Sequence, residues 1–184
     1  VLAEKNTAAF LARYYRRPAP KVALYVSHAF DAASKAGLDP YLLTAIMSIE
    51  SSLNPKARSH KGAKGLMQVH VAVHEDRFKP YGGPSKAFDP EISVKVGAGI
   101  LAGMIERTGS VDGALKHYVG AANLRSDGGY GAKVISMRER IWIASQGRKV
   151  PNKVELAGAI KRANLAHAAA MATVRTAAGS VASG

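Results

Sequence analysis

The sequence contains no cysteine, which excludes a disulfide scaffold and any metal site built on thiolates. Long apolar runs are also missing, and none reaches the roughly 18 residues that a membrane-spanning helix needs. Alternating β-branched segments, which are typical of strands, are almost absent. Because 47% of the 184 residues are hydrophobic, we expect a soluble, globular and nearly all-helical protein with a substantial core.

Acidic side chains are scarce as well. There are 13 of them against 26 lysines and arginines, so the net charge is +13, which favours a polyanionic partner. Residues 37–146 carry 14 basic and 10 acidic side chains, whereas residues 1–36 and 147–184 together carry 12 and 3. The excess charge in the flanks suits an acidic envelope surface or a secretion or wall-associated complex. Solubility alone is the alternative, and nucleic acid is the less favoured partner.

Apolar residues at helical spacing predict a chain of helices. They cover residues 4–16, 21–36, Asp39-Pro40 to just after Glu50, 91–107, 111–118, 130–142 and 154–178. Residues 71–86, rich in proline and glycine, are expected to be mostly irregular. This pattern predicts an N-terminal helical segment over 1–36, a catalytic domain over 37–146, and a basic, alanine-rich helix with a frayed tail over 147–184.

Two features of the later helices have a packing interpretation. Gly97, Gly99 and Gly103 weaken the helix over 91–107, and glycines at such spacing usually let a neighbouring helix come close. Phosphate binding is not expected there, because the glycines lie within the helix and not in a strand-to-helix turn. Trp142 follows the apolar spacing of its helix and is interpreted as a core residue.

Glu50 is the acid around which the candidate site is built. Leu43, Met47 and Glu50 share one helical face, so the carboxyl group continues a surface of hydrocarbon. Pro55 limits the helix to a few residues beyond Glu50. Burial and the negative end of the helix dipole both disfavour the ionised form and predict a raised pKa. The basic residues within 56–64 leave the opposite alternative open, because a cation pointing at the carboxylate would lower that pKa.

The residues after Glu50 form a long, spaced motif. Its members are Glu50-Ser51, Asn54-Pro55, Ala57, Ser59, Gly62-Ala63 and Gly65-Leu66-Met67-Gln68. The motif resembles the signature of the soluble lytic transglycosylase (SLT) domain, a lysozyme-like family that cleaves bacterial peptidoglycan. This resemblance implies an all-α, lysozyme-like multi-helix domain with a substrate cleft and little or no β-structure.

The same resemblance assigns roles to single residues. It implies that Glu50 is the catalytic acid, that Ser59 lies beside it, and that Gln68 lines the sugar subsites. Met67 and His70 are further candidates for substrate binding. His70 departs from the family pattern, since many members carry an apolar residue at that position.

Two tyrosines complete the candidate site. The family carries Tyr-Asn-Ala-Gly after the corresponding helix, with a tyrosine that reaches towards the glutamate, and Tyr118 matches it. Val119 stands in place of the family's asparagine, and Asn123 is the candidate substitute. Tyr130 resembles the family's second tyrosine, at the head of the closing helix. A core aromatic is the alternative interpretation of Tyr118, and a common helix-start aromatic that of Tyr130.

The resemblance implies a single-acid reaction in which the sugar supplies its own nucleophile and a 1,6-anhydro product forms. This mechanism needs no metal or organic cofactor, and His70 and His74 lack both the HExxH order and the third ligand of a zinc site. A hydrolytic lysozyme of the same fold and a non-catalytic basic wall-binding module are the alternatives. We further expect an exported monomer, in the periplasm or cell envelope, that acts on peptidoglycan glycan strands.

Overall fold

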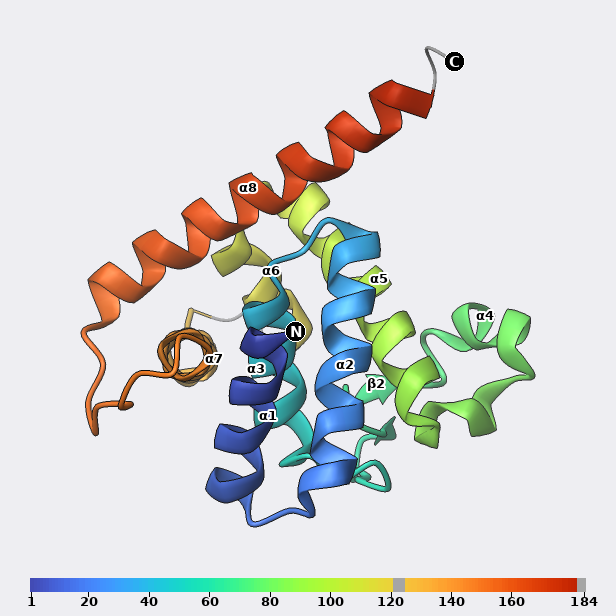
Figure 1. The fold of residues 1–184 in the computed structure, drawn as a ribbon. Coiled ribbons are helices and arrows are strands. Elements are labelled where there is room, and N and C mark those ends of the chain that lie inside the picture. The colour runs from blue at the N-terminus through green and yellow to red at the C-terminus, as the bar shows by residue number, and fades with distance from the viewer. Residues whose placement is uncertain (121–124, 182–184) are drawn as a thin grey trace.

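The computed structural model, which describes residues 1–120 and 125–181, is a bundle of helices with a small two-stranded sheet (Figure 1). The elements are α1 (Leu2–Tyr15), α2 (Ala19–Ala36), α3 (Pro40–Ser51), β1 (Ala63–Lys64), β2 (Val69–His70), α4 (Glu75–Phe78), η1 (Lys79–Tyr81), η2 (Pro84–Phe88), α5 (Pro90–Thr108), α6 (Val111–Tyr118), α7 (Tyr130–Ser145) and α8 (Leu156–Val181). The predicted all-helical fold class is confirmed.

Side-chain caps fix where several of these helices begin. Asp39 accepts a hydrogen bond of 3.0 Å from the backbone N–H of Tyr41, at the start of α3. Asp89 and Ser110 act in the same way at the starts of α5 and α6. Such caps satisfy N–H groups that have no partner within the helix. Gly37 ends α2 in the left-handed conformation, as its position in the sequence predicts.

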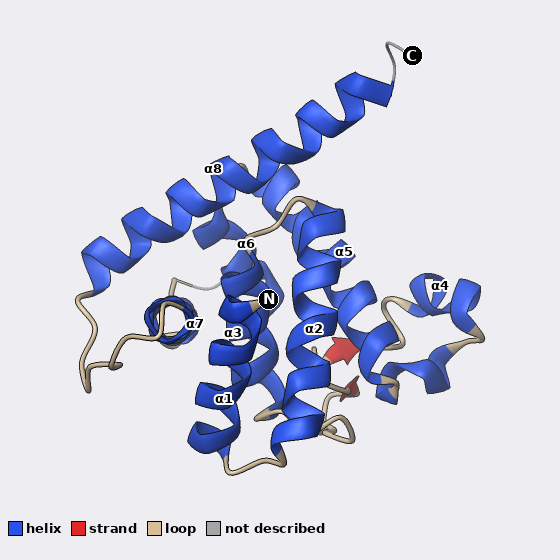
Figure 2. Cartoon of the chain, viewed as in Figure 1, coloured by secondary structure: helices blue, strands red, loops and turns tan. Residues whose placement is uncertain are grey.

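The region expected to be irregular contains more order than the sequence indicates. It includes α4 and the two 3-10 helices η1 and η2, while β1 and β2 form a short antiparallel hairpin just before it (Figure 2). The expectation for the glycines of α5 also needs correction at Gly97. A Cβ at Gly97 would lie 2.7 Å from the Cβ of Met67, so this glycine admits a side chain from a loop and not a neighbouring helix.

Helix α3 passes through the centre of the protein. It packs against α2 on one side and against α7 on another, and residues 42–48 are all buried. Helix α1 packs on both α2 and α7, so its buried Leu11 belongs to the same core cluster as Leu43 and Ile141. This packing leaves the C-terminal end of α3, which carries Glu50, next to the β1–β2 hairpin region.

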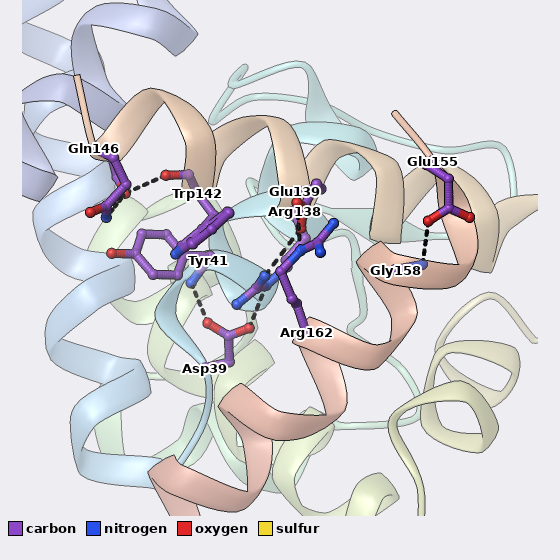
Figure 3. Close-up of polar contacts among 10 residues, drawn as sticks. Asp39, Tyr41, Arg138, Glu139, Trp142, Gln146, Glu155, Gly158 and Arg162 are labelled. Atoms are coloured by element: carbon purple, nitrogen blue, oxygen red, sulfur yellow. Dashed lines mark hydrogen bonds and ion pairs between the residues drawn. The ribbon is translucent and has the colours of Figure 1, made fainter. Parts of the chain in front are cut away.

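A buried network of charged side chains ties α3, α7 and α8 together (Figure 3). The Nε of Arg138 in α7 donates to the Oδ2 of Asp39 at 2.8 Å, and the two side chains are 3% and 1% exposed. The neighbouring Glu139 accepts a 2.7 Å hydrogen bond from the Nε of Arg162 in α8. Trp142, predicted in the core, is half-buried, and the Arg162 guanidinium lies 5.8 Å from its ring centroid.

Helix α8 lies across the top of the bundle in Figure 1 and extends past it. The buried face of its first half is built of small residues, Ala159 and Ala163, while Leu165 is 61% exposed. Further along, Val174 lies close to Gly37 at the end of α2. Within the described ranges, no helix combines the length and the hydropathy needed to cross a bilayer.

Candidate active site

Glu50 lies in the last turn of α3 and lines a hollow of about 350 Å³. The helix ends one residue later, because Ser52 takes the left-handed conformation and donates its N–H to the carbonyl oxygen of Ser48 at 2.9 Å. The hollow is lined by Glu50, Ser59, His60, Lys61, Ala63, Gln68, His70, Tyr118 and Val119. The structure thus gathers most of the predicted site residues around one carboxyl group.

Burial raises the pKa of Glu50 to about 7, and a hydrogen bond from Tyr130 opposes this rise. The cause is desolvation: burial removes water from the carboxyl group, and this destabilises the charged carboxylate more than the neutral acid. The alternative of a neighbouring cation does not apply to Arg58 or Lys64, which lie over the ring of Phe88 at 4.5 and 5.9 Å. Near neutral pH, Glu50 therefore exists in both its protonated and its ionised form.

Tyr130 fixes one oxygen of this carboxyl group. Its hydroxyl donates to the Oε1 of Glu50 at 2.5 Å, across 80 residues of sequence. Tyr130 is the first residue of α7, and its position is held by Asp127, which accepts hydrogen bonds from the N–H groups of Gly129 (2.9 Å) and Gly131 (2.7 Å). Asp127 was not among the predicted site residues, although an aspartate followed by two glycines is a usual signal for a turn in which its side chain bonds the backbone two residues on.

Replacing Tyr130 with phenylalanine should move the pH dependence of activity. A general acid works only while protonated, so activity falls as pH rises through its pKa, here near 7. The tyrosine hydroxyl stabilises the ionised carboxylate, and its removal raises the pKa of Glu50 further. We expect the falling limb of the kcat/KM profile to move up by about one pH unit, as for the loss of one hydrogen bond to a charged group.

Tyr118→Phe is the matched control for this measurement, because the Tyr118 hydroxyl bonds to a different group. Its profile should keep the falling limb of the parent protein. Equal displacement in the two variants, or none in Tyr130→Phe, would contradict the role given to Tyr130.

The Gly65–Gln68 stretch of the motif forms the tight connection between β1 and β2. Gly65 has φ +80°, and a Cβ there would lie 1.9 Å from the carbonyl oxygen of Ala87, so no other residue fits. The Ser93 hydroxyl of α5 accepts a hydrogen bond from the N–H of Met67 at 3.2 Å, which fastens the loop to the core. Glycine is therefore needed here for close packing as well as for the turn.

The side chains of Ser59 and Gln68, two other predicted site residues, form hydrogen bonds to backbone groups of the loop. Ser59 is exposed and closes a turn, with its hydroxyl accepting the N–H of Ala63 at 3.0 Å. Gln68 directs its amide nitrogen to the carbonyl oxygens of Ala57 (3.1 Å) and Gly65 (3.0 Å), which presents its side chain at the hollow in one orientation. His70 is exposed at the end of β2.

Tyr118 and Met67 are arranged differently from what the resemblance implies. Tyr118 shares the hollow with Glu50, but its hydroxyl donates to the carbonyl oxygen of Met67 at 2.8 Å, and Tyr130 makes the contact with the glutamate. The Met67 side chain is fully buried, so it does not face the hollow. Its contribution to the site is its carbonyl oxygen, which holds the Tyr118 hydroxyl. Val119 is 40% exposed at the hollow. Asn123 lies outside the described residues.

Two residues that line the hollow were not among the predicted site residues, His60 and Lys61, although Lys61 is one of the basic residues considered as a neighbour of Glu50. Their position within the motif, directly between Ser59 and Gly62, is the sequence feature that could have indicated that they line the site. Both are exposed, and Lys61 places a positive charge at the hollow. No group of three or more potential metal ligands occurs within residues 1–120 and 125–181.

Comparison with known families agrees with this geometry. The model of the transglycosylase SLT domain matches residues 27–132, more than half of the chain. The chain therefore belongs to the transglycosylase SLT domain family, within the lysozyme-like superfamily. The matched segment contains Glu50, the glycine-rich loop and both site tyrosines.

Curated relatives cover part of the chain. A transglycosylase of Enterobacteria phage PRD1 is 35% identical over 105 residues, which are 57% of this chain and 37% of the relative. Membrane-bound lytic murein transglycosylase C of Sodalis glossinidius is 42% identical over 84 residues, 42% of this chain and 24% of the relative. The Cronobacter sakazakii protein of the same name is 40% identical over 84 residues, 42% and 23% respectively. The matches thus span between 23% and 37% of these relatives.

Proposed function

We propose that this protein is a peptidoglycan lytic transglycosylase, which cleaves the β-1,4 bond between N-acetylmuramic acid and N-acetylglucosamine without using water. The observation that carries the proposal is the solitary carboxyl group of Glu50, half-buried at the hollow with a pKa of about 7. Ordinary glycosidases place a second carboxylate across the scissile bond. Among the described residues lining this hollow, Glu50 is the one acid.

The first step is proton donation. Protonated Glu50 gives its proton to the glycosidic oxygen as the bond from that oxygen to the anomeric carbon breaks, and the N-acetylglucosamine end leaves as an alcohol. Tyr130 occupies Oε1 of the carboxyl group, which leaves Oε2 to carry the proton towards the sugar. The carboxylate formed is stabilised by the same tyrosine hydroxyl.

The second step closes the ring and restores the acid. The C6 hydroxyl of the muramic acid attacks its own anomeric carbon, and its proton passes to the Glu50 carboxylate. The product is a 1,6-anhydro sugar, and the enzyme returns to its starting protonation state with no water consumed. A pKa near the working pH suits a group that must give and then take a proton.

The remaining residues of the hollow hold the glycan in a reactive geometry. Ser59, Gln68, His70 and Tyr118 line it together with Glu50, and orientation of this kind contributes several kcal/mol to catalysis, roughly 7–11 in favourable cases. Because the substrate is the bacterial wall, we place the protein in the periplasm or cell envelope. The names of the membrane-bound murein transglycosylases among its relatives support this location.

Product analysis tests the proposal directly. Purified protein is incubated with peptidoglycan sacculi, and the soluble muropeptides are examined by mass spectrometry beside those released by a hydrolytic muramidase. We expect products lighter by one water than the hydrolytic reference, with a 1,6-anhydro end. Hydrated products would assign the protein to the lysozymes, and the absence of released muropeptides would leave a wall-binding module.

A further inference from the structure

Two hollows on the surface away from Glu50 are lined by cations and by no acid. The first, about 460 Å³, lies between α1 and the segment after α7, and its charged lining residues are Arg13, Arg148 and Lys149. The second, about 310 Å³, lies where α1 passes into α2, and its charged lining residues are Arg17, Lys21 and Lys56. All six side chains are exposed. We call these six residues the basic strip.

The strip brings together segments that are far apart in the sequence. Arg13 and Arg17 lie four residues apart at the end of α1, so one cation from each hollow comes from the same short stretch. Arg148 and Lys149 come from the other end of the chain, and Lys56 follows the catalytic helix. Within residues 1–120 and 125–181, no ion pair joins any of the six to an acidic side chain.

The other described hollows differ in this respect. One beside α2 and α8 includes Glu4 and Asp31, and one between α5 and α8 combines Glu106 with Arg175. The hollow of Glu50 has its own acid. Uncompensated positive charge in a concave surface attracts anions more strongly than the same charge on a convex one, because the surrounding low-dielectric walls focus the field. Five of the six cations of the basic strip belong to residues 1–36 and 147–184, so part of the charge of the flanks lines these two recesses.

One residue of the basic strip is hydrogen-bonded to the end of α3, the helix that carries Glu50. The Nε of Arg17 donates to the carbonyl oxygen of Ser52 at 3.0 Å, at the C-cap of α3 and two residues after Glu50. A cation at this end of a helix complements its dipole. A ligand bound along the strip therefore lies next to the C-terminal end of α3, the helix end that carries Glu50.

We propose that the basic strip is a second binding site for peptidoglycan, one that holds the carboxylates of stem peptides on a strand next to the one being cut. Two separate recesses, each lined by three cations, suit anionic groups carried at intervals on a linear polymer. A flat anionic membrane would not enter them. This proposal rests on the proposed function, because it takes the polymer cut at Glu50 as the ligand of the strip.

Binding to insoluble sacculi tests the strip without cleavage. All proteins carry Glu50→Gln, so the glycan remains intact, and co-sedimentation is measured over a range of protein concentrations at physiological salt. The strip variant is Arg13→Gln/Arg148→Gln/Lys149→Gln. The control variant, Lys86→Gln/Lys161→Gln/Arg175→Gln, removes the same charge from exposed positions elsewhere. Three exposed charge contacts of modest strength predict an apparent Kd about tenfold higher for the strip variant and less than about twofold higher for the control.

The chemical source of the anion is tested in parallel. Sacculi stripped of stem peptides by an amidase should bind the parent and the strip variant equally. Equal losses in the strip and control variants on intact sacculi would overturn the proposal. So would a strip-specific loss seen with phosphatidylglycerol vesicles or duplex DNA and not with sacculi. These outcomes are independent of catalysis: failure of the proposed function appears separately, as absence of anhydro products from protein with native Glu50.

Discussion

Glu50→Gln will lower kcat on peptidoglycan by about 10²–10⁴-fold, the usual contribution of a positioned general acid. Glutamine keeps the shape of the side chain and can still accept the Tyr130 hydroxyl, but it has no proton to give to the glycosidic oxygen. Release of soluble muropeptides measures the loss. Binding to sacculi should stay near that of the parent, because the hollow and its lining are unchanged.

The same substitution should stabilise the fold at neutral pH. The pKa of Glu50 is about 7 when folded and near its ordinary value of 4.5 when unfolded. Between these two values the unfolded chain ionises while the folded protein retains its proton, so the free energy of unfolding of the parent decreases as pH rises through this window. Glutamine does not ionise, so the variant lacks this loss. We expect its free energy of unfolding to exceed that of the parent by roughly 1–3 kcal/mol at pH 7 and to differ little below pH 4.

Thermal or urea unfolding at the two pH values checks the second part of this prediction, with Tyr118→Phe as an active-site control that leaves the carboxyl group in place. A glutamine variant that retains parental turnover would remove Glu50 from the mechanism. A variant that loses turnover together with its cooperative unfolding transition would indicate a structural defect.

Arg138→Ala is expected to cost about 3–5 kcal/mol of unfolding free energy, the typical result of leaving one buried charge without its partner. The Asp39 carboxylate is 1% exposed and loses its 2.8 Å hydrogen bond from Arg138, while Glu139 loses the guanidinium that lies 3.6 Å away. Glu139 keeps its ion pair with Arg162, so Asp39 is the acid left without a partner. Urea denaturation, with the slope of the transition compared to that of the parent, measures the effect.

Two further variants make this prediction specific. Asp39→Asn keeps the cap of α3, because its side-chain oxygen can still accept the N–H of Tyr41, while its amide NH2 cannot accept from the Nε of Arg138, so it removes the ion pair without removing the cap. Arg175→Ala, an exposed change on α8, should lie within about 0.5 kcal/mol of the parent. If Arg138→Ala were as mild as Arg175→Ala, the buried network would not be a source of stability.

Much of the fold follows from local features of the sequence. Asp39, Asp89 and Ser110 begin helices and Gly37 ends one, and each is a residue type that favours its capping position. The alanine-rich segment is helical, as its composition predicts, and Ala159 and Ala163 in its first half are buried in the core. These features depend on neighbouring residues along the chain, so a single sequence contains the information.

The arrangement of the site depends on contacts that the sequence does not encode locally. Glu50 and Tyr130 are separated by 80 residues, and Arg138 and Asp39 by 99. Spacing alone placed Glu50 at a helix end and indicated burial, but it gave no means to decide which tyrosine reaches the carboxyl group. The role of Met67 as a buried support was hidden for the same reason, since it depends on the approach of α5 at Gly97.

The arrangement of the basic residues in space is likewise not predictable from the sequence alone. Counting residues placed the basic excess in the flanks, but only folding brings Arg13 of α1 beside Arg148 and Lys149. A composition describes how much charge a segment carries. The recesses that make this charge useful for recognition are a property of tertiary structure.

The family match ends at residue 132, within the first turn of α7. A fragment excised at that boundary would keep Glu50 and Tyr130, yet it would lose Arg138, the ion-pair partner of Asp39, together with most of the α7 surface that packs on α3. The smallest self-sufficient piece of this chain is therefore larger than its recognisable motif. Any transplant of this catalytic machinery into another scaffold must bring along the rest of α7 and the beginning of α8.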